Sequence, residues 1–275
     1  MFVHFLITRF NIVQDWYTTA NRNHADIQTN KWLDERFRLY EQYCLPSVAN
    51  QDTNNFVWLV LYNSETPNRY KEKISQFQKK CKMFMPVFLE PYGDEGALIQ
   101  NLIDDYITAD TTHIITTRLD NDDMIRNDYI SMIQKAFKYD MNDVFLDYGA
   151  GFQFNEKEKV LYYCPNFELS HYVSRVVNIE NKEKTVLVDH SRLKEFGEYK
   201  MLKSVNGGAW IETVHSCNAW NRLGGWKPIY KTKELQWFPC VKLSFFNYLR
   251  SYTKFFISKS VRWIIRKFHK HILKK

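Results

Sequence analysis

Residues 112–123 form a short β-branched segment that runs directly into a cluster of acidic residues. Positions 112–117 are rich in isoleucine and threonine and contain no glycine or proline, which is typical of a buried strand. Arg118 follows, and the cluster itself consists of Asp120, Asp122 and Asp123. Open α/β sheets bind ligands at the carboxyl ends of their strands. The stretch therefore predicts an α/β fold with a ligand site at the end of this strand.

The acidic cluster has two interpretations. Three neighbouring carboxylates repel one another, which lowers the stability of the fold. A divalent cation such as Mg²⁺ or Mn²⁺, which prefers oxygen ligands, would remove that repulsion. Alternatively, the cluster is a solvated turn in which Asp123 or Asn127 caps a helix predicted over residues 125–138. The apolar strand directly before the cluster favours a metal and phosphate site.

Strand and helix patterns alternate in the chain before this cluster. Strands are predicted over 2–8, 55–62 and 83–89, and helices over 32–48, 68–80 and 97–107. This order predicts a doubly wound, mostly parallel sheet with helices on both faces. The strand ends near Arg9, Asn63 and Gly93 should then lie at the same edge as Asp120.

The second half of the chain is less regular. It predicts strands over 143–147 and 149–155, paired as a hairpin, and further strands over 160–163, 172–180, 185–188 and 209–216. No Pro/Ser-rich linker and no internal repeat separates the halves. We therefore expect a single α/β domain over 1–241 with a mixed C-terminal half, followed by a separate tail over 242–275.

Cysteine usage and hydropathy indicate the compartment. Five scattered cysteines form no CxxC pair, which argues against a disulfide framework and favours a reducing cytoplasm. The N-terminus lacks the pattern of a signal peptide, and no apolar stretch approaches the ~20 residues that span a bilayer. We expect a cytoplasmic protein that is peripheral on the inner face of the plasma membrane.

The tail carries the basic character of the whole chain. Residues 242–275 hold ten Lys/Arg and no Asp/Glu, which leaves 28 basic against 31 acidic residues in the body. Phe245, Leu249, Tyr252 and Phe256 share one helical face. This pattern favours a helix in the interface of an anionic membrane over a basic helix packed on the body or a nucleic-acid arm. We expect no nucleic-acid partner.

Several segments together resemble a known family. They are residues 5–11, 36–37, 45–48 with Gln51, 58–60, 117–123, and 209–211 with His215. Over residues 1–226 the chain resembles glycosyltransferases of the A-type fold, and more closely the bacterial putative rhamnosyltransferase family. The most specific part is the Arg-Leu-Asp-x-Asp-Asp segment, since an isolated Asp-x-Asp occurs widely by chance.

The resemblance implies binding roles for residues in these segments. Asp120 and Asp122 would hold Mg²⁺ or Mn²⁺, which bridges the diphosphate of a UDP- or dTDP-sugar, and His215 would add a metal contact unless it is a core histidine. The residues implied to hold the nucleotide are Thr8, Arg9, Phe10 and Asn63. Related enzymes often carry an acid where this chain has Asn63.

The residues around these segments suggest catalytic roles. Arg118 is placed to contact phosphate or to pair with the acidic cluster. An inverting transfer needs a carboxylate base near the acceptor hydroxyl, and the candidates are Asp123, Asp147, Asp189 and Glu212, of which Glu212 is favoured. The tryptophans Trp210, Trp220 and Trp226 either stack on sugars or pack in the core.

The sequence therefore predicts a metal-dependent glycosyltransferase that moves a sugar from a nucleotide sugar to a glycan or lipid-linked acceptor. Rhamnose as the sugar rests on the family name. Clustered aspartates at strand ends also serve metal-dependent phosphohydrolases and nucleotidyltransferases, which is the main alternative. A non-catalytic membrane or nucleic-acid binding module is the third hypothesis.

Overall fold

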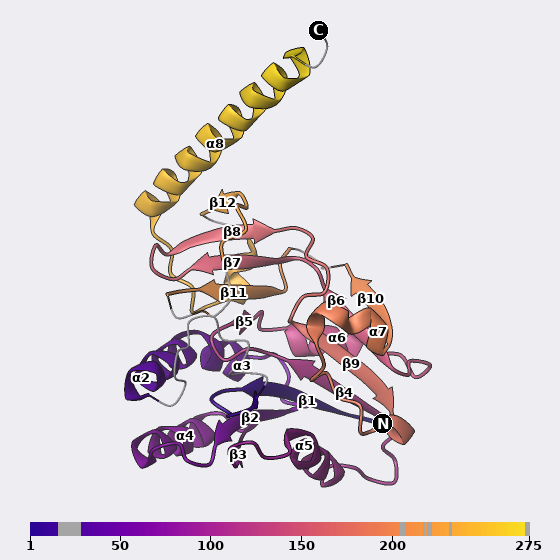
Figure 1. Cartoon of the computed structure of the whole chain (residues 1–275). Coiled ribbons are helices and arrows are strands. Elements are labelled where there is room, and N and C mark those ends of the chain that lie inside the picture. Colours follow the sequence, from indigo (N-terminus) through magenta and orange to yellow (C-terminus); the bar gives the residue numbers. More distant parts are fainter. Residues whose placement is uncertain (16–28, 204–206, 217, 219–221, 231–232, 273–275) are drawn as a thin grey trace.

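The computed structural model describes residues 1–15, 29–203, 207–216, 218, 222–230 and 233–272, with side chains described as far as residue 260 (Figure 1). Its larger sheet has the strand order β10-β6-β9-β4-β1-β2-β3. These strands are β1 (Phe2–Arg9), β2 (Val57–Asn63), β3 (Phe84–Leu89), β4 (His113–Arg118), β6 (Val144–Tyr148), β9 (Val173–Asn178) and β10 (Glu198–Leu202). Strands β1 to β4 are parallel, and β9 runs antiparallel to both β4 and β6. The mostly parallel sheet is confirmed.

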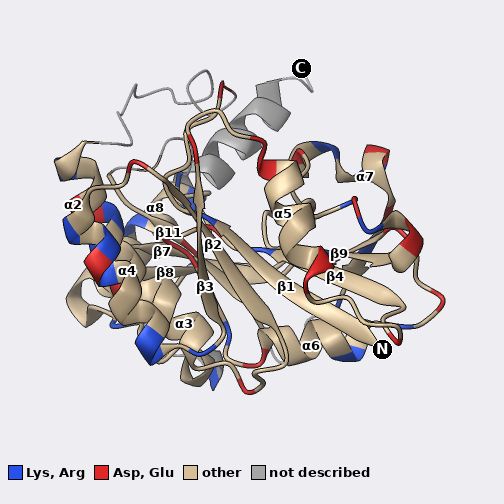
Figure 2. Cartoon of the chain, turned by 90° about the horizontal axis from the view of Figure 1, so that it is seen from below, with Lys and Arg blue, Asp and Glu red and all other residues tan. Residues whose placement is uncertain are grey.

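Helices cover both faces of the parallel part (Figure 2). One face packs against α2 (Asn30–Leu39), α4 (Asn68–Lys80) and α6 (Tyr129–Ala136), and the other face packs against α5 (Glu95–Asp104). The central strands are buried on both faces, as the continuous apolar run of β2 predicts. This layering leaves the strand ends as the place where a ligand can approach the central strands.

Two helices differ from the sequence-based prediction. The helix expected over 32–48 contains a π-helical turn at Tyr40–Cys44, after which α3 (Leu45–Ala49) continues with Pro46 in its first turn, where its missing N–H is tolerated. Helix α6 begins at Tyr129 instead of 125, because residues 124–125 pair as a strand. Its N-cap residue is Asp128. The interpretation of Asp123 or Asn127 as the helix cap is therefore wrong.

A second, smaller sheet lies over the carboxyl ends of the first, with the order β12-β8-β7-β11-β5. Its strands are β5 (Met124–Ile125), β7 (Gly151–Asn155), β8 (Val160–Cys164), β11 (Trp210–Val214) and β12 (Pro228–Ile229). The hairpin predicted from 143–155 is wrong, because β6 and β7 belong to different sheets and β7 pairs with β8. Residues 185–188 form no strand.

Helix α8 (Phe245–Ile272) projects from the edge of the smaller sheet (Figure 1). Its first turns are attached to the body, since Asn247 Nδ2 donates to the carbonyl of Glu158 at 2.8 Å and Arg250 pairs with the Glu158 carboxylate at 2.8 Å. Short helix α7 (Leu193–Phe196) lies at the opposite side, next to β10. Within the described residues, no helix combines the length and apolar character needed to cross a bilayer.

Candidate functional site

The ends of β1, β2 and β4 meet at one edge, as the strand order predicts. Asn121, in the turn after β4, donates through Nδ2 to the carbonyls of Arg9 at 2.9 Å and Phe10 at 3.0 Å. Asn11 accepts from the backbone N–H of Asn63 at 3.2 Å. These side-chain bonds connect three neighbouring strand ends into one surface, above which the acidic cluster lies.

Most of the residues expected to hold the nucleoside have their side chains engaged inside the protein. Thr8 is buried and accepts from the indole N–H of Trp58 at 3.0 Å, and Phe10 packs in an aromatic cluster. Asn63 Oδ1 accepts from the backbone N–H of Glu65 at 3.1 Å. Arg9 is bound by both oxygens of Glu95 at 2.6 and 2.8 Å and is partly exposed. These residues shape the edge, and Arg9 contributes a partly exposed positive charge to it.

Asp122 is paired with basic side chains. Its Oδ2 accepts from Arg36 Nη1 at 2.6 Å, lies 2.7 Å from His215 Nε2, and accepts from Asn218 Nδ2 at 3.2 Å. Burial alone would raise the pKa of this carboxyl, but Arg36 and His215 outweigh it and hold the pKa well below its usual range. The negative charge of Asp122 is thus already balanced within the protein, and His215 faces that ion pair.

Asp123 is fully buried and is bound by neutral donors. Its Oδ1 accepts from the backbone N–H of Thr213 at 2.7 Å, and its Oδ2 accepts from the hydroxyl of Tyr172 at 2.7 Å. Burial and the neighbouring charge of Asp122 raise the pKa of the Asp123 carboxyl to about 7. A nearby cation would keep this carboxylate ionised.

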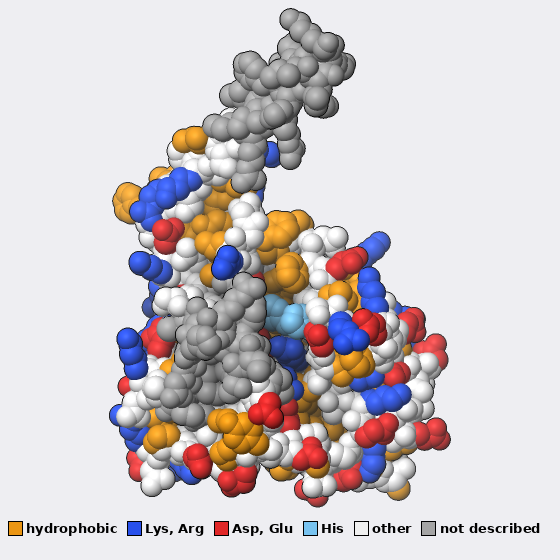
Figure 3. All heavy atoms as spheres, viewed as in Figure 1, with side chains coloured by type: hydrophobic (Ala, Val, Ile, Leu, Met, Phe, Trp, Pro, Cys, Tyr) orange, Lys and Arg blue, Asp and Glu red, His pale blue; other side chains and the backbone are white. Residues whose placement is uncertain are grey.

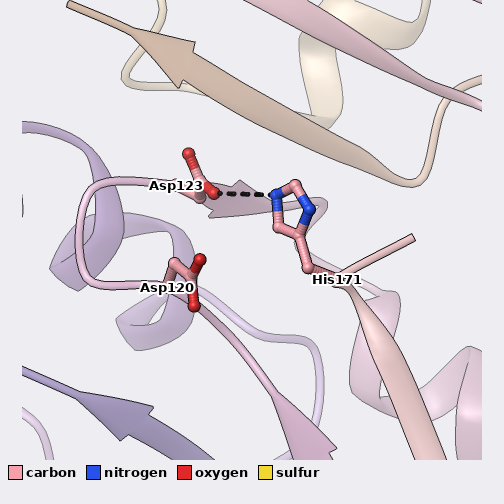
Figure 4. Close-up of side chains that lie close together, drawn as sticks. All are labelled: Asp120, Asp123 and His171. Atoms are coloured by element: carbon pink, nitrogen blue, oxygen red, sulfur yellow. Dashed lines mark ion pairs between the residues drawn. The ribbon is translucent and has the colours of Figure 1, made fainter. Parts of the chain in front are cut away.

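Asp120, Asp123 and His171 converge on one point (Figure 4). Their ligand atoms lie within 4.8 Å of one another. His171 Nε2 is buried and forms an ion pair with Asp123 Oδ2 at 3.5 Å, drawn as the dashed line in Figure 4, but it has no hydrogen-bond partner. Two carboxylates and one imidazole form a donor set that suits Mn²⁺, and also Mg²⁺ completed by further oxygens.

Arg118 lies beside this group. Its Nε is 3.3 Å from Asp120 Oδ1, and Asp120 is the most exposed carboxylate of the cluster, with 39% of its side chain accessible. Burial would raise the pKa of Asp120, but the charge of Arg118 gives a net lowering. Arg118 is expected either to contact phosphate or to pair with the acidic cluster, and the structure shows the ion pair. Its side chain remains partly exposed, so an anionic ligand can still approach it.

A cavity of about 570 Å³ adjoins the cluster on the side of the smaller sheet. Glu212 on β11 lines it and is buried, and its Oε2 accepts from Gln153 Nε2 at 2.6 Å. Burial raises the pKa of Glu212. The other lining side chains that bear on its chemistry are His171, His190, Arg222 and Trp226. Figure 3 shows histidine atoms in a hollow of this face. The arrangement can hold a polar molecule beside a carboxylate base.

The remaining candidate residues lie elsewhere. Asp147 is buried and accepts from Ser170 N, Ser170 Oγ and Tyr199 Oη at 2.9, 2.6 and 2.7 Å, so it orders the loop that carries His171. Asp189 caps a short turn at the surface. Trp210 is a core residue stacked on Tyr172. The prediction for Trp220 lies outside the described residues.

Sequence reasoning missed His171, Gln153 and His190. His171 directly precedes the strand predicted over 172–180, but only the antiparallel pairing of β9 with β4 brings this position to the acidic cluster. Gln153 reaches Glu212 because β7 and β11 are adjacent, with these two residues in register. These placements depend on pairing between distant segments, for which no local pattern exists in the chain.

Comparison with known proteins gives a family match. Residues 4–225 match the family model described as "Putative rhamnosyl transferase". No curated protein matches the sequence.

Three solved structures illustrate the likeness in fold. S. aureus TarS is 10% identical and covers 78% of this chain and 36% of its own, with a TM-score of 0.42. TarS 1-349 in complex with UDP is 12% identical, with 78% and 61% covered and a TM-score of 0.41. A Bacillus anthracis protein described as a putative glucose-1-phosphate thymidylyltransferase is 8% identical, with 76% and 89% covered and a TM-score of 0.35. The chain spans less than two thirds of the length of these TarS chains.

The pairing of Arg36 with Asp122 predicts a large effect on stability. Arg36→Met leaves a buried carboxylate without its strongest partner and should lower the free energy of unfolding by about 3 kcal/mol. Arg36→Met combined with Asp122→Asn should recover part of that loss. Urea denaturation measures both. Arg192→Met removes an exposed arginine and should leave the midpoint nearly unchanged. A midpoint for Arg36→Met equal to that of Arg192→Met would contradict the assignment.

Proposed function

Because the chain belongs to the putative rhamnosyl transferase family and is therefore a glycosyltransferase, we propose that it moves a sugar from a nucleotide-sugar donor to a glycan or lipid-linked acceptor. The observation that carries the proposal is the buried group of Asp120, Asp123 and His171, which lies beside the cavity of Glu212. Rhamnose as the transferred sugar rests on the family description alone.

We assign the divalent cation, Mg²⁺ or Mn²⁺, to Asp120, Asp123 and His171. This set differs from the expected Asp120, Asp122 and His215. The charge balance supports the change, because Asp122 and His215 are already paired with each other and with Arg36. When bound, the cation would act as a Lewis acid that neutralises charge on the departing diphosphate.

Basic residues at the strand ends suit the donor diphosphate. Arg118 and Arg9 each lie at this edge, each is held by a carboxylate, and each remains partly exposed. Charge-assisted hydrogen bonds from guanidinium groups to phosphate oxygens are strong and directional. The edge formed by the ends of β1 and β2 would hold the nucleoside of a UDP- or dTDP-sugar.

Glu212 is the proposed base for an inverting transfer. Gln153 holds one oxygen of its carboxylate at 2.6 Å and so fixes the orientation of the group. Its raised pKa makes it a stronger base than an exposed glutamate. As the acceptor oxygen forms its bond to the anomeric carbon and the bond to the diphosphate breaks, the hydroxyl proton passes to Glu212. Asp123 and Asp147 are less suited, because hydrogen bonds from the protein already engage both oxygens of each.

Calorimetric titration with UDP, dTDP and GDP, in Mn²⁺ or EDTA, tests the donor site. One nucleotide should bind at least about tenfold more weakly without the metal, a difference of about 1.4 kcal/mol. Asp123→Asn and His171→Gln should remove the metal dependence, and His113→Gln, at the other end of β4, should retain it. If the folded protein binds none of these nucleotides, the donor-site proposal is wrong. Release of free phosphate from the nucleotide sugar would favour the phosphohydrolase alternative.

The base is tested by Glu212→Gln. The turnover number, followed as release of nucleoside diphosphate, should fall by about 10²- to 10⁴-fold, with nucleotide affinity unchanged. Glu168→Gln is the matched control, since Glu168 lines the same cavity but is exposed. Equal turnover for the two variants would remove Glu212 from the catalytic role.

We also propose that α8 attaches the enzyme to an anionic membrane surface. Large apolar side chains on its described part are exposed, namely Phe245, Phe246, Leu249, Phe256 and Ile257. The tail from 242 onward adds ten basic residues with no acid. Apolar side chains with surrounding positive charge suit the headgroup region of anionic lipids.

Vesicle sedimentation measures this attachment. The double variant Phe246→Ser and Ile257→Ser should lose most of its binding to vesicles that contain phosphatidylglycerol, because both side chains leave the surface of the body. Tyr139→Ser, which alters an equally exposed aromatic residue outside α8, should bind as the native protein does. Unchanged partitioning of the double variant would rule out the apolar face as the anchor.

A further inference from the structure

A second cavity of about 570 Å³ lies where α8 meets the smaller sheet. Aromatic side chains from both parts line it, Tyr162 on β8 and Phe255 on α8, together with Trp226. Two lysines of α8, Lys254 and Lys259, also line it. Glu158 is the acid in this lining, and it is paired with Arg250. Within the described side chains, neither lysine forms an ion pair, so the cavity has unbalanced positive charge.

Helix α8 turns a mostly polar face toward this cavity. The helix residues that line the cavity are Ser251, Lys254, Phe255, Ser258 and Lys259. Their spacing of three and four places them on one face, which is mostly polar. The exposed apolar residues, such as Phe246 and Ile257, fall on the opposite face. The first turns of the helix also pack aromatic side chains on the body, since Phe245 and Tyr248 contact Tyr230. The inward polar face suits a polar ligand.

This second cavity adjoins the cavity of Glu212 through one short segment. Alternate residues of 222–226 line the two spaces: Arg222 and Gly224 face the first, Leu223 and Gly225 face the second, and Trp226 lines both. Gln153 connects this wall to the proposed base, because it donates to Glu212 and to the carbonyl of Arg222 and accepts from the N–H of Gly224. A molecule with one end at Glu212 can thus continue past Trp226 toward α8.

We propose that the second cavity binds the part of the acceptor that lies beyond its reacting sugar, as a saccharide that carries a phosphate group. Lys254 and Lys259 bind the phosphate by charge-assisted hydrogen bonds, and Trp226 and Tyr162 supply flat faces for sugar rings. The inference rests on the proposed transferase function and adds the class of acceptor. It also gives α8 two roles, with lipid on its outer face and acceptor on its inner face.

A matched pair of probes tests the proposal, trehalose 6-phosphate and trehalose, which differ by one phosphate. Binding is measured calorimetrically on the full chain. The fluorescence of Trp226 is recorded as well, and the variant Trp226→Phe, which lacks this signal, identifies its contribution. Trehalose 6-phosphate should bind at least about tenfold more tightly than trehalose. The double variant Lys254→Gln and Lys259→Gln should lose that preference. Lys79→Gln with Lys80→Gln removes the same charge from exposed positions on α4 and should keep it.

The outcomes separate this inference from the transferase proposal. The cavity variant should still bind the nucleoside diphosphate with Mn²⁺, because its lysines are not in the donor site. Normal nucleotide binding with equal affinity for the two disaccharides would overturn the acceptor inference alone. Geranyl diphosphate serves as a lipid phosphate without sugar, and if it alone bound through the two lysines, the saccharide assignment would be wrong. Absence of nucleotide binding in the native protein would instead count against the donor site.

Discussion

The buried carboxylate of Asp123 holds together the parts of the chain on which the site depends. It follows β4 of the larger sheet, accepts from the backbone of β11 in the smaller sheet through Thr213, and accepts from Tyr172 at the start of β9. A buried carboxylate without such donors would be strongly destabilising. The bonds therefore fix the smaller sheet above the strand ends of the larger one. That placement brings Glu212 and its cavity beside the acidic cluster.

Three adjacent aspartates acquire three different environments from the fold. Asp122 is balanced by Arg36 and His215, Asp123 is buried among neutral donors, and Asp120 is partly exposed beside Arg118. Repulsion between carboxylates increases with the charge that remains unbalanced. The three different environments therefore lower the electrostatic free energy of the cluster. The fold also leaves Asp120, Asp123 and His171 together, a group in which two carboxylates share one imidazole. The metal assignment follows from this local charge balance more than from the spacing of the aspartates.

The proposed donor edge and the two cavities follow one another across the molecule. The proposed donor edge lies at the ends of β1, β2 and β4. The cavity of Glu212 comes next, and the cavity under α8 follows, separated from it by residues 222–226. Helix α8 contributes a mostly polar face to that last cavity and exposes Phe246 and Ile257 on the opposite side. The two roles that we propose for α8, membrane attachment and acceptor binding, therefore fall to opposite faces of the same helix.

The sequence by itself determined the parallel strands, the helices between them and the position of the acidic cluster at a strand end, because all of these depend on local periodicity and on residue type. The segments that resemble the family are likewise visible in the sequence alone. Only the tertiary structure decided that β6 and β7 enter different sheets, that β5 replaces the start of a predicted helix, and that His171 and Gln153 reach the site. The physical reason is that these features arise from pairing between segments distant in the chain, and the partners of a strand or a buried charge are selected by the whole fold rather than by neighbouring residues.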